Sequence, residues 1–291
     1  MKLAALPALL ALSISVNASF IVTENANAEA LAQNLLGSGI TLVGVSTYTG
    51  SSQAAGTFTG FTTGTYTNPV TNVTGKVDIN SGIVLSTGRV SNIAQTYNGG
   101  ADTDLGTAGD SALSDIAGYG TNDAAILEFS FIPDKDQLFF QFVFASTEYP
   151  GWVNSAYNDV FGFFVNGTNI ALLPDGTTPI TINSINVGKP TGTAASNPQF
   201  FTNYSQQGVT PYNLGGSTIL LTATANVRAN EVNTFRVAIA DASDSSLDSA
   251  VFLGAGSFST EEPPPVGEVP EPGTYALVGL GLAAVAYKKR K

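Results

Sequence analysis

The chain contains no histidine and no cysteine in its 291 residues. A Ser-His-Asp triad, a cysteine nucleophile, haem attached through cysteine and the common zinc sites all need one of these residues, so the sequence excludes them. Disulfide bonds are excluded too, which is compatible with a bacterial envelope protein whose core is large enough to fold without them. A GxxxxGK phosphate loop, a Ser-x-x-Lys pair and the Asp-Thr-Gly or Asp-Ser-Gly of an aspartic dyad are also absent.

Charged residues are scarce, at 11% of the chain, and basic residues are the scarcest. Between Ser19 and Thr260 there are 18 acidic and 6 basic residues, a net charge of −12. This balance argues against nucleic acid as a partner, because phosphate binding requires a basic face. The 31 glycines, together with recurring Thr, Ser and Asn, are typical of a β-rich extracellular protein.

The N-terminal segment has the three regions of a secretory signal. Met1-Lys2 is followed by an apolar stretch over 3–16 and then by Asn17-Ala18. This pattern predicts a signal peptide over 1–18, cleaved after Ala18, and therefore export.

The C-terminal segment contains a linker and a short apolar run. The linker, 261–274, is rich in Pro and Glu, and it is followed by 13 apolar residues over 275–287 and four terminal cations. As a helix this run would span about 20 Å, short of the roughly 30 Å hydrocarbon core, so we expect a weak and temporary inner-membrane anchor with its basic end in the cytoplasm.

The intervening residues, 19–260, have the pattern of one all-β domain. Helical spacing over 24–37, with Gly37 as the stop, predicts the only substantial helix. The Gly/Thr/Ser-rich run over 48–74 favours edge strands and loops, and 188–213 is a long polar loop. Short apolar runs separated by turn signals, without βαβ alternation, predict an antiparallel β-sandwich of jelly-roll type. The predicted strands are 40–45, 83–88, 124–132, 138–144, 160–165, 170–173, 180–187, 218–223, 235–240 and 251–253.

Two acidic loops follow predicted core strands. The first joins the strands at 138–144 and 160–165 and contains Glu148 and Asp159, and the second, 241–249, contains Asp241 and Asp248. Because each adjoins a strand with an apolar face, we expect the loops to meet at one end of the sandwich. The alternative is two separate solvated turns, which Asp and Ser favour intrinsically. A third loop with alternating carboxylates, 98–106, lacks the Gly and Glu of an EF-hand in register.

These loops predict a calcium site and a ligand-binding surface. Calcium takes roughly 6 to 8 oxygen ligands, whereas zinc would favour the His or Cys that this chain lacks. The predicted metal ligands are Glu148, Asn158, Asp159, Asp241 and Asp248. The predicted stacking faces for a ligand are Tyr149, Trp152 and Tyr157.

Two segments carry a resemblance to known families. Val269-Pro270-Glu271-Pro272, the Gly-rich apolar run and the basic end resemble the PEP-CTERM sorting signal of Gram-negative bacteria, which implies recognition by an exosortase, removal of the tail and delivery to the cell surface or extracellular matrix. The body resembles the choice-of-anchor L domain of bacterial surface proteins with various anchoring tails. That resemblance rests on the sequences at 102–105, 142–150, 157–163, 241–244 and 248–252.

Three functions are compatible with these features. The first is a non-catalytic surface or matrix protein in exopolysaccharide-associated adhesion or biofilm structure, and the second is a calcium-dependent carbohydrate-binding module. The third is a glycoside hydrolase that uses a carboxylate pair such as Glu148 and Asp159. We rank it last and predict no enzyme activity, because paired carboxylates in loops are common in all-β proteins without catalysis.

Overall fold

The computed structural model describes residues 19–67, 72, 74–189, 194–203 and 212–263. The predicted signal peptide, the Val269–Pro272 motif and the predicted C-terminal helix lie outside these residues. Among the residues described, no helix is long and apolar enough to cross a membrane.

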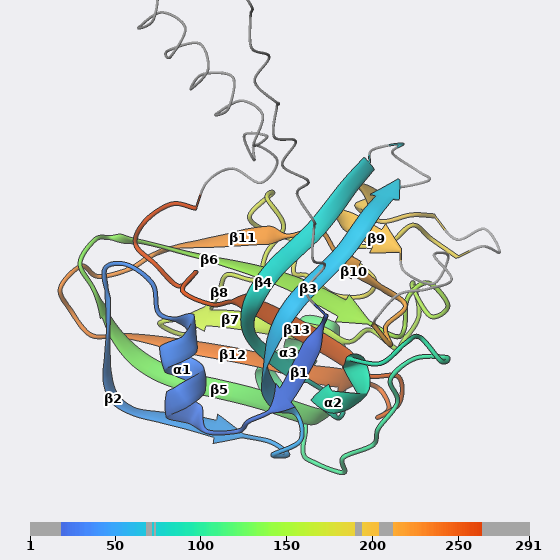
Figure 1. The fold of residues 1–291 in the computed structure, drawn as a ribbon, viewed down its shortest axis with the longest axis horizontal. Coiled ribbons are helices and arrows are strands. Elements are labelled where there is room, and N and C mark those ends of the chain that lie inside the picture. The colour runs from blue at the N-terminus through green and yellow to red at the C-terminus, as the bar shows by residue number, and fades with distance from the viewer. Residues whose placement is uncertain (1–18, 68–71, 73, 190–193, 204–211, 264–291) are drawn as a thin grey trace, which may run out of the picture.

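Two antiparallel sheets pack face to face, which confirms the predicted β-sandwich (Figure 1). The larger sheet has the order β1-β3-β4-β13-β6-β10-β9, with β11 also pairing with β6, and the smaller has the order β2-β5-β12-β7-β8. The larger sheet is built from β1 (Ile21–Glu24), β3 (Ala55–Thr67), β4 (Thr74–Ser86), β6 (Gln137–Ser146), β9 (Phe201–Asn203), β10 (Gly216–Thr218), β11 (Leu221–Asn226) and β13 (Ser249–Gly254). The smaller sheet is built from β2 (Ile40–Thr49), β5 (Thr121–Pro133), β7 (Val160–Val165), β8 (Thr168–Asn169) and β12 (Asn233–Ala242).

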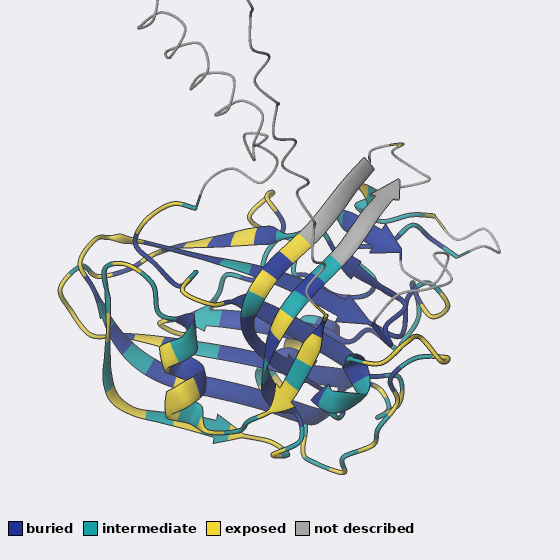
Figure 2. Ribbon diagram, in the orientation of Figure 1, coloured by how far each residue is buried: buried dark blue, intermediate teal, exposed yellow. Residues whose placement is uncertain are grey.

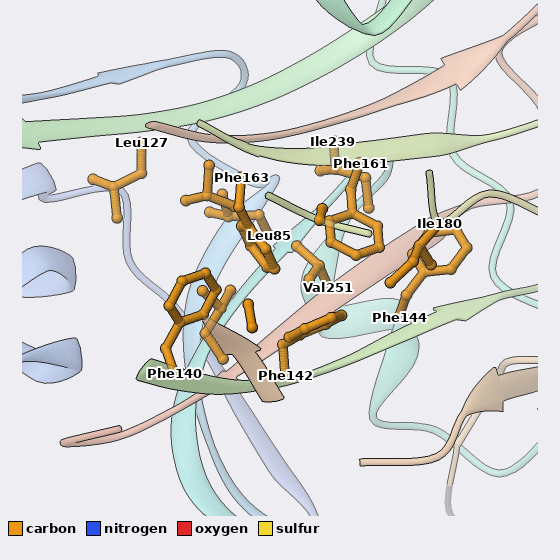
Figure 3. Close-up of a cluster of buried hydrophobic side chains, with 14 of the residues drawn as sticks. Leu85, Leu127, Phe140, Phe142, Phe144, Phe161, Phe163, Ile180, Ile239 and Val251 are labelled. Atoms are coloured by element: carbon orange, nitrogen blue, oxygen red, sulfur yellow. The ribbon is translucent and has the colours of Figure 1, made fainter. Parts of the chain in front are cut away.

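The main core lies between the sheets and is rich in phenylalanine. Because side chains alternate along a strand, Phe140, Phe142 and Phe144 of β6 all point to the same face. They meet Phe161 and Phe163 of β7 from the opposite sheet (Figure 3), with ring centroids as close as 4.7 Å between Phe140 and Phe163. The two strands that flank the first acidic loop, β6 and β7, therefore pack against each other through these phenylalanine rings.

The outer face of each sheet is also covered, so the central strands are buried on both sides (Figure 2). Val143 and Phe252, on the outer face of the larger sheet, pack in a second cluster with Tyr212 and with Val90 of α2 (Val90–Ile93). On the smaller sheet, Leu113 of α3 (Ser111–Ala117) packs over alanines of β12. This double cover explains why every residue of β13 is buried.

The predicted N-terminal helix is present but shorter than 24–37. It is α1 (Ala28–Leu35), and it begins where the Asn27 side chain accepts a hydrogen bond from the Ala30 N–H at 2.9 Å. The expectation that Gly37 stops it is wrong, because the helix already ends at Leu35 and Leu36 caps it in an extended conformation. A Cβ added at Gly37 would instead overlap the backbone of Gly256, so close packing requires glycine there.

Three other expectations are corrected by the structure. The Gly/Thr/Ser-rich run contains the whole of the long strand β3, because Thr has a high β propensity even where apolar residues are few. β1 covers only Gly56–Thr59 of its outer side, so β3 is an inner strand there and pairs with β4 alone beyond it. The helices α2 and α3 are additional. The long loop 188–213 contains, in its described part, the 3₁₀ turn η1 (Pro198–Phe200) and the strand β9.

The segments 170–173 and 180–187 are not the regular strands that their apolar content predicts. They make isolated bridges, such as Leu172 with Pro179 and Val160 with Thr181. Thr181 and Ser184 exchange hydrogen bonds between their hydroxyls and each other's backbone N–H, and this local turn replaces a strand ladder. Ile182 still reaches the core from this irregular backbone.

The C-terminal end of the described domain is anchored in the core. Phe258 is fully buried, and its ring packs within 4.9 Å of Phe131 and 4.8 Å of Phe235, centroid to centroid. Ser259 exchanges two backbone hydrogen bonds with Phe139, of 2.8 and 2.9 Å. The chain therefore leaves the sandwich from a fixed point beside α1 and β6.

Candidate functional site

Strands of both sheets end or begin at the same end of the sandwich. The register pairs Ser249 of β13 with Ser146 of β6, and in the other sheet Ala240 of β12 with Val160 of β7. The loops between β6 and β7 and between β12 and β13, with the segment after β4, therefore meet at this end. We call the carboxyl groups gathered there the end cluster: Glu148, Asp159, Asp241 and Asp248.

Asp159 connects the two sheets through both of its carboxyl oxygens. Its Oδ1 accepts a hydrogen bond from the Ala242 N–H at 3.0 Å, and its Oδ2 accepts one from the Ser249 hydroxyl at 2.6 Å. The side chain is 1% exposed. Each oxygen still has a second lone pair.

Asp248 is held from the other side by the loop that follows α2. Its Oδ1 accepts a hydrogen bond from the Thr103 N–H at 2.8 Å, whereas its Oδ2 is buried and has no hydrogen-bond partner. A Cβ added at Gly88 would overlap this carboxyl group, so glycine at that position makes room for it.

Asp241 and Glu148 are buried, and carboxyl oxygens of both residues have no hydrogen bond. Both carboxyl oxygens of Asp241, which is 0% exposed, and Oε2 of Glu148, which is 2% exposed, lack a hydrogen bond of normal geometry. The Thr87 hydroxyl lies close enough to Asp241 to lower its pKa against the effect of burial, and Asp241 does the same for Asp159, but neither contact meets hydrogen-bond geometry. Burying a polar group without a partner costs about 1–3 kcal/mol, and more for a charge. The end cluster is therefore costly to fold unless something compensates its oxygens.

Burial shifts the acidity of the whole end cluster in one direction. It raises the pKa of Glu148 to about 9, with the charge of Asp159 adding to the effect. It also raises the pKa values of Asp159 and Asp248 to about 7. The pKa of Asp241 is raised well above its usual range, first by burial and then by the charge of Asp159. These shifts show carboxyl groups that lack solvent and lie near one another.

The remaining residue of the predicted metal set, Asn158, has its side chain engaged in loop contacts. Its Oδ1 accepts a hydrogen bond from the Asn183 N–H at 2.9 Å, and its Nδ2 donates one to the Ala117 carbonyl at 3.3 Å. Within the described ranges, no group of three or more acidic side chains is gathered closely enough to hold a metal ion as it stands.

Only part of the predicted aromatic surface is accessible. The expectation that Tyr149 offers a stacking face is wrong, because its ring is 2% exposed and packs edge-on against Phe201 at 4.8 Å. Trp152 is 46% exposed, and its ring meets that of half-buried Tyr157 edge-to-face at 5.2 Å between centroids. An accessible aromatic pair therefore lies in the same loop as Glu148 and Asp159.

Three acidic residues near the end cluster were not in the predicted set, and one of them is Asp244, whose charge adds to burial in raising the pKa values of Glu148 and Asp159. Asp123, at the start of β5, is 1% exposed and accepts hydrogen bonds from the N–H groups of Thr107 and Leu105 at 2.6 and 2.9 Å. Asp102 accepts one from the Leu247 N–H at 3.2 Å. The alternating carboxylates of the 98–106 loop were the signal for Asp102, whereas Asp123, which directly precedes an apolar run, gave none.

Fold and end cluster together define an all-β domain whose acidic loops close one end of a two-sheet sandwich. Residues 18–259 match the family model of the Choice-of-anchor L domain, and the chain belongs to this family, which confirms the resemblance. Residues 268–291 match the PEP-CTERM protein-sorting motif. The chain is therefore exported, processed by an exosortase and placed at the cell surface or outside the cell. No curated protein and no solved structure matches the chain.

Proposed function

We propose that the mature protein is a non-catalytic component of the cell surface or extracellular matrix that takes part in exopolysaccharide-associated adhesion or biofilm structure. The observation that carries this proposal is the sorting motif at 268–291, which follows a family domain that covers 18–259. A domain delivered by such a motif reaches the compartment where exopolysaccharide is found.

The end cluster argues against the hydrolase alternative. A glycoside hydrolase needs two carboxyl groups that face a sugar from an open cleft. Glu148 and Asp159 are both almost completely buried, and both oxygens of Asp159 accept hydrogen bonds within the domain. Neither group is placed to reach a glycosidic bond.

The exposed aromatic pair favours a second candidate, a carbohydrate-binding module. Aromatic side chains combine a large apolar face with a low entropic cost of ordering, so an exposed ring held by a neighbour is suited to stacking on a sugar. Trp152 has such an exposed ring, and the edge-to-face contact with Tyr157 fixes the orientation of the Trp152 ring. In this reading the pair binds the matrix polysaccharide directly.

Binding of the exported protein to exopolysaccharide isolated from its host tests both candidates. We expect retention on the polysaccharide without release of reducing sugars, and Trp152→Ala is expected to weaken binding about tenfold or more, equivalent to about 1.4 kcal/mol. Val232→Ala is the control, because it truncates an exposed apolar side chain (51% exposed) that precedes β12 at the opposite end of the sandwich.

Each outcome has a distinct reading. Sugar release that stops in a Glu148→Gln variant would overturn the non-catalytic role. Retention that is unaffected by Trp152→Ala would exclude the aromatic pair as the binding surface and leave adhesion to another face. No retention at all would contradict the association with exopolysaccharide.

A further inference from the structure

The end cluster concentrates the buried oxygens that have no partner. In the described part of the chain, seven buried side-chain polar atoms lack a hydrogen bond, and four of them are carboxyl oxygens of Glu148, Asp241 and Asp248. Folded proteins leave few such atoms, so a concentration at one place calls for a physical explanation.

Two explanations can compensate buried carboxyl groups that lie near one another. One is protonation, in which Asp241 stays neutral beside Asp159, and the other is a bound cation. A proton held between Asp241 and Asp159 would pair oxygens of those two carboxyl groups only, and it would leave Asp248 Oδ2 and Glu148 Oε2 without hydrogen-bond partners. A cation coordinates oxygens from several loops at once, so it accounts for the whole set.

The oxygens come from loops that are already tied to one another. Thr147, next to Glu148, donates its backbone N–H to the Asp248 carbonyl at 3.1 Å, and the Ser249 N–H is donated to the Thr87 hydroxyl at 2.9 Å. Asp159 is fixed between Ala242 and Ser249 by the hydrogen bonds described above. These hydrogen bonds hold the backbones of the loops that carry the carboxyl groups against one another.

We propose that Asp241, Asp248 and Glu148, with Asp159 at its second lone pairs, bind one calcium ion that closes this end of the sandwich. Because no three acidic side chains are gathered at metal-binding distance as they stand, the ion is expected to draw them inward. Carboxylates, backbone carbonyls and water supply the oxygen ligands that calcium takes at about 2.3–2.6 Å in a flexible geometry. Magnesium demands a stricter octahedron and dehydrates reluctantly, so a set of separate loops suits it less well.

The test is thermal unfolding of the exported protein in EGTA and in calcium. At a calcium concentration about ten times the Kd, we expect the Tm to rise by about 3–6 °C for a domain of this size. Isothermal titration calorimetry of the wild type is expected to give one calcium per chain, and magnesium at the same concentration a smaller shift in Tm.

Asp241→Asn is the decisive variant. The amide keeps the shape of the carboxyl group and removes a buried charge, so the variant should fold in EGTA, as circular dichroism can check, and lose the calcium-dependent shift. Asp115→Asn, an equal change of charge at an exposed position of α3, should keep the whole shift.

Three results would overturn the proposal. The first is that the folded wild type binds no calcium. The second is that Asp241→Asn keeps the full calcium-dependent shift in Tm. The third is that magnesium raises the Tm of the wild type as much as calcium does. If the wild type binds no calcium and Asp241→Asn is as stable as the wild type or more stable in EGTA, the end cluster holds a protonated carboxyl pair instead of a cation. None of these results depends on the proposed role in the matrix, because retention on exopolysaccharide is measured separately.

Discussion

At the scale of single residues, two buried tyrosines differ in what their hydroxyl groups contact. The Tyr212 hydroxyl accepts a hydrogen bond from the Thr62 N–H at 2.7 Å, whereas the Tyr149 hydroxyl is buried without a hydrogen-bond partner. Burial raises the pKa of both phenols. An unpaired buried polar group costs about 1–3 kcal/mol, so the two hydroxyls should have opposite effects on stability.

Tyr149→Phe is therefore expected to leave the free energy of unfolding unchanged or to raise it by up to about 1 kcal/mol, because it removes a polar atom that has no partner. Tyr212→Phe, the matched variant, leaves the Thr62 N–H without its acceptor and should lower the free energy of unfolding by about 1–2 kcal/mol. Urea denaturation measures both. A loss for Tyr149→Phe as large as that for Tyr212→Phe would show that the Tyr149 hydroxyl has a polar partner.

At the scale of elements, short apolar runs predicted the central strands well. The predicted run 160–165 coincides with β7, and 124–132 lies within β5. The pattern was weaker where other forces decide the structure. Long strands in the Thr-rich run depend on pairing with β1 and β4, and the turn at Thr181 depends on local hydroxyl hydrogen bonds.

The helix α3 was missed although its sequence carries end signals. Asp110 caps its first turn through the Leu113 N–H at 3.1 Å, and Gly118 ends it with φ +76°. An acidic N-cap and a glycine seven residues after the start are recognisable, but seven residues are too few for helical periodicity to stand out.

The pairing of β4 with β13 depends on a glycine. Gly82 lies opposite Gly254, and a Cβ added there would overlap the Leu253 carbonyl of the neighbouring strand. Gly82→Ala is expected to lower the free energy of unfolding by about 2–3 kcal/mol, since the strands must separate to admit the methyl group.

Gly120→Ala is the control for this change. A Cβ at Gly120 would have open space and a backbone conformation that other residues adopt, so its effect should stay within about 0.5 kcal/mol. Chemical denaturation of both variants gives the comparison. Equal stability of the two would mean that β4 and β13 are not packed as closely as the structure shows.

At the scale of the whole molecule, the end cluster is assembled from positions far apart in the sequence. Asp159 accepts a hydrogen bond from the hydroxyl of Ser249, which lies 90 residues later in the sequence. The residue types and the strand ends were visible in the sequence, so the set of acidic residues was predictable. Which oxygens are hydrogen-bonded, and that Tyr149 is buried while Trp152 is exposed, depend on how the loops pack and were not predictable.

The sorting motif predicts a change in the covalent chain. Protein recovered from the native cell surface should lack residues 275–291 by mass spectrometry, because exosortase processing removes the tail. Replacing Pro270 and Pro272 by Ala within the motif should leave the tail attached and hold the protein in the inner membrane. Replacing Pro263 and Pro264 in the linker should leave processing intact. An intact Lys291 on surface-exposed wild-type protein would contradict the prediction.

The burial of Phe258 has a mechanical consequence. If the mature protein is held to its surroundings through residues that follow Thr260, any tension on the domain arrives beside this ring. Before the sandwich can yield, the pull must withdraw Phe258 from its aromatic neighbours and break the backbone hydrogen bonds that Phe258 and Ser259 make with Leu35 and Phe139. The load therefore falls on the aromatic core between the sheets, rather than on a strand that could be peeled from an edge.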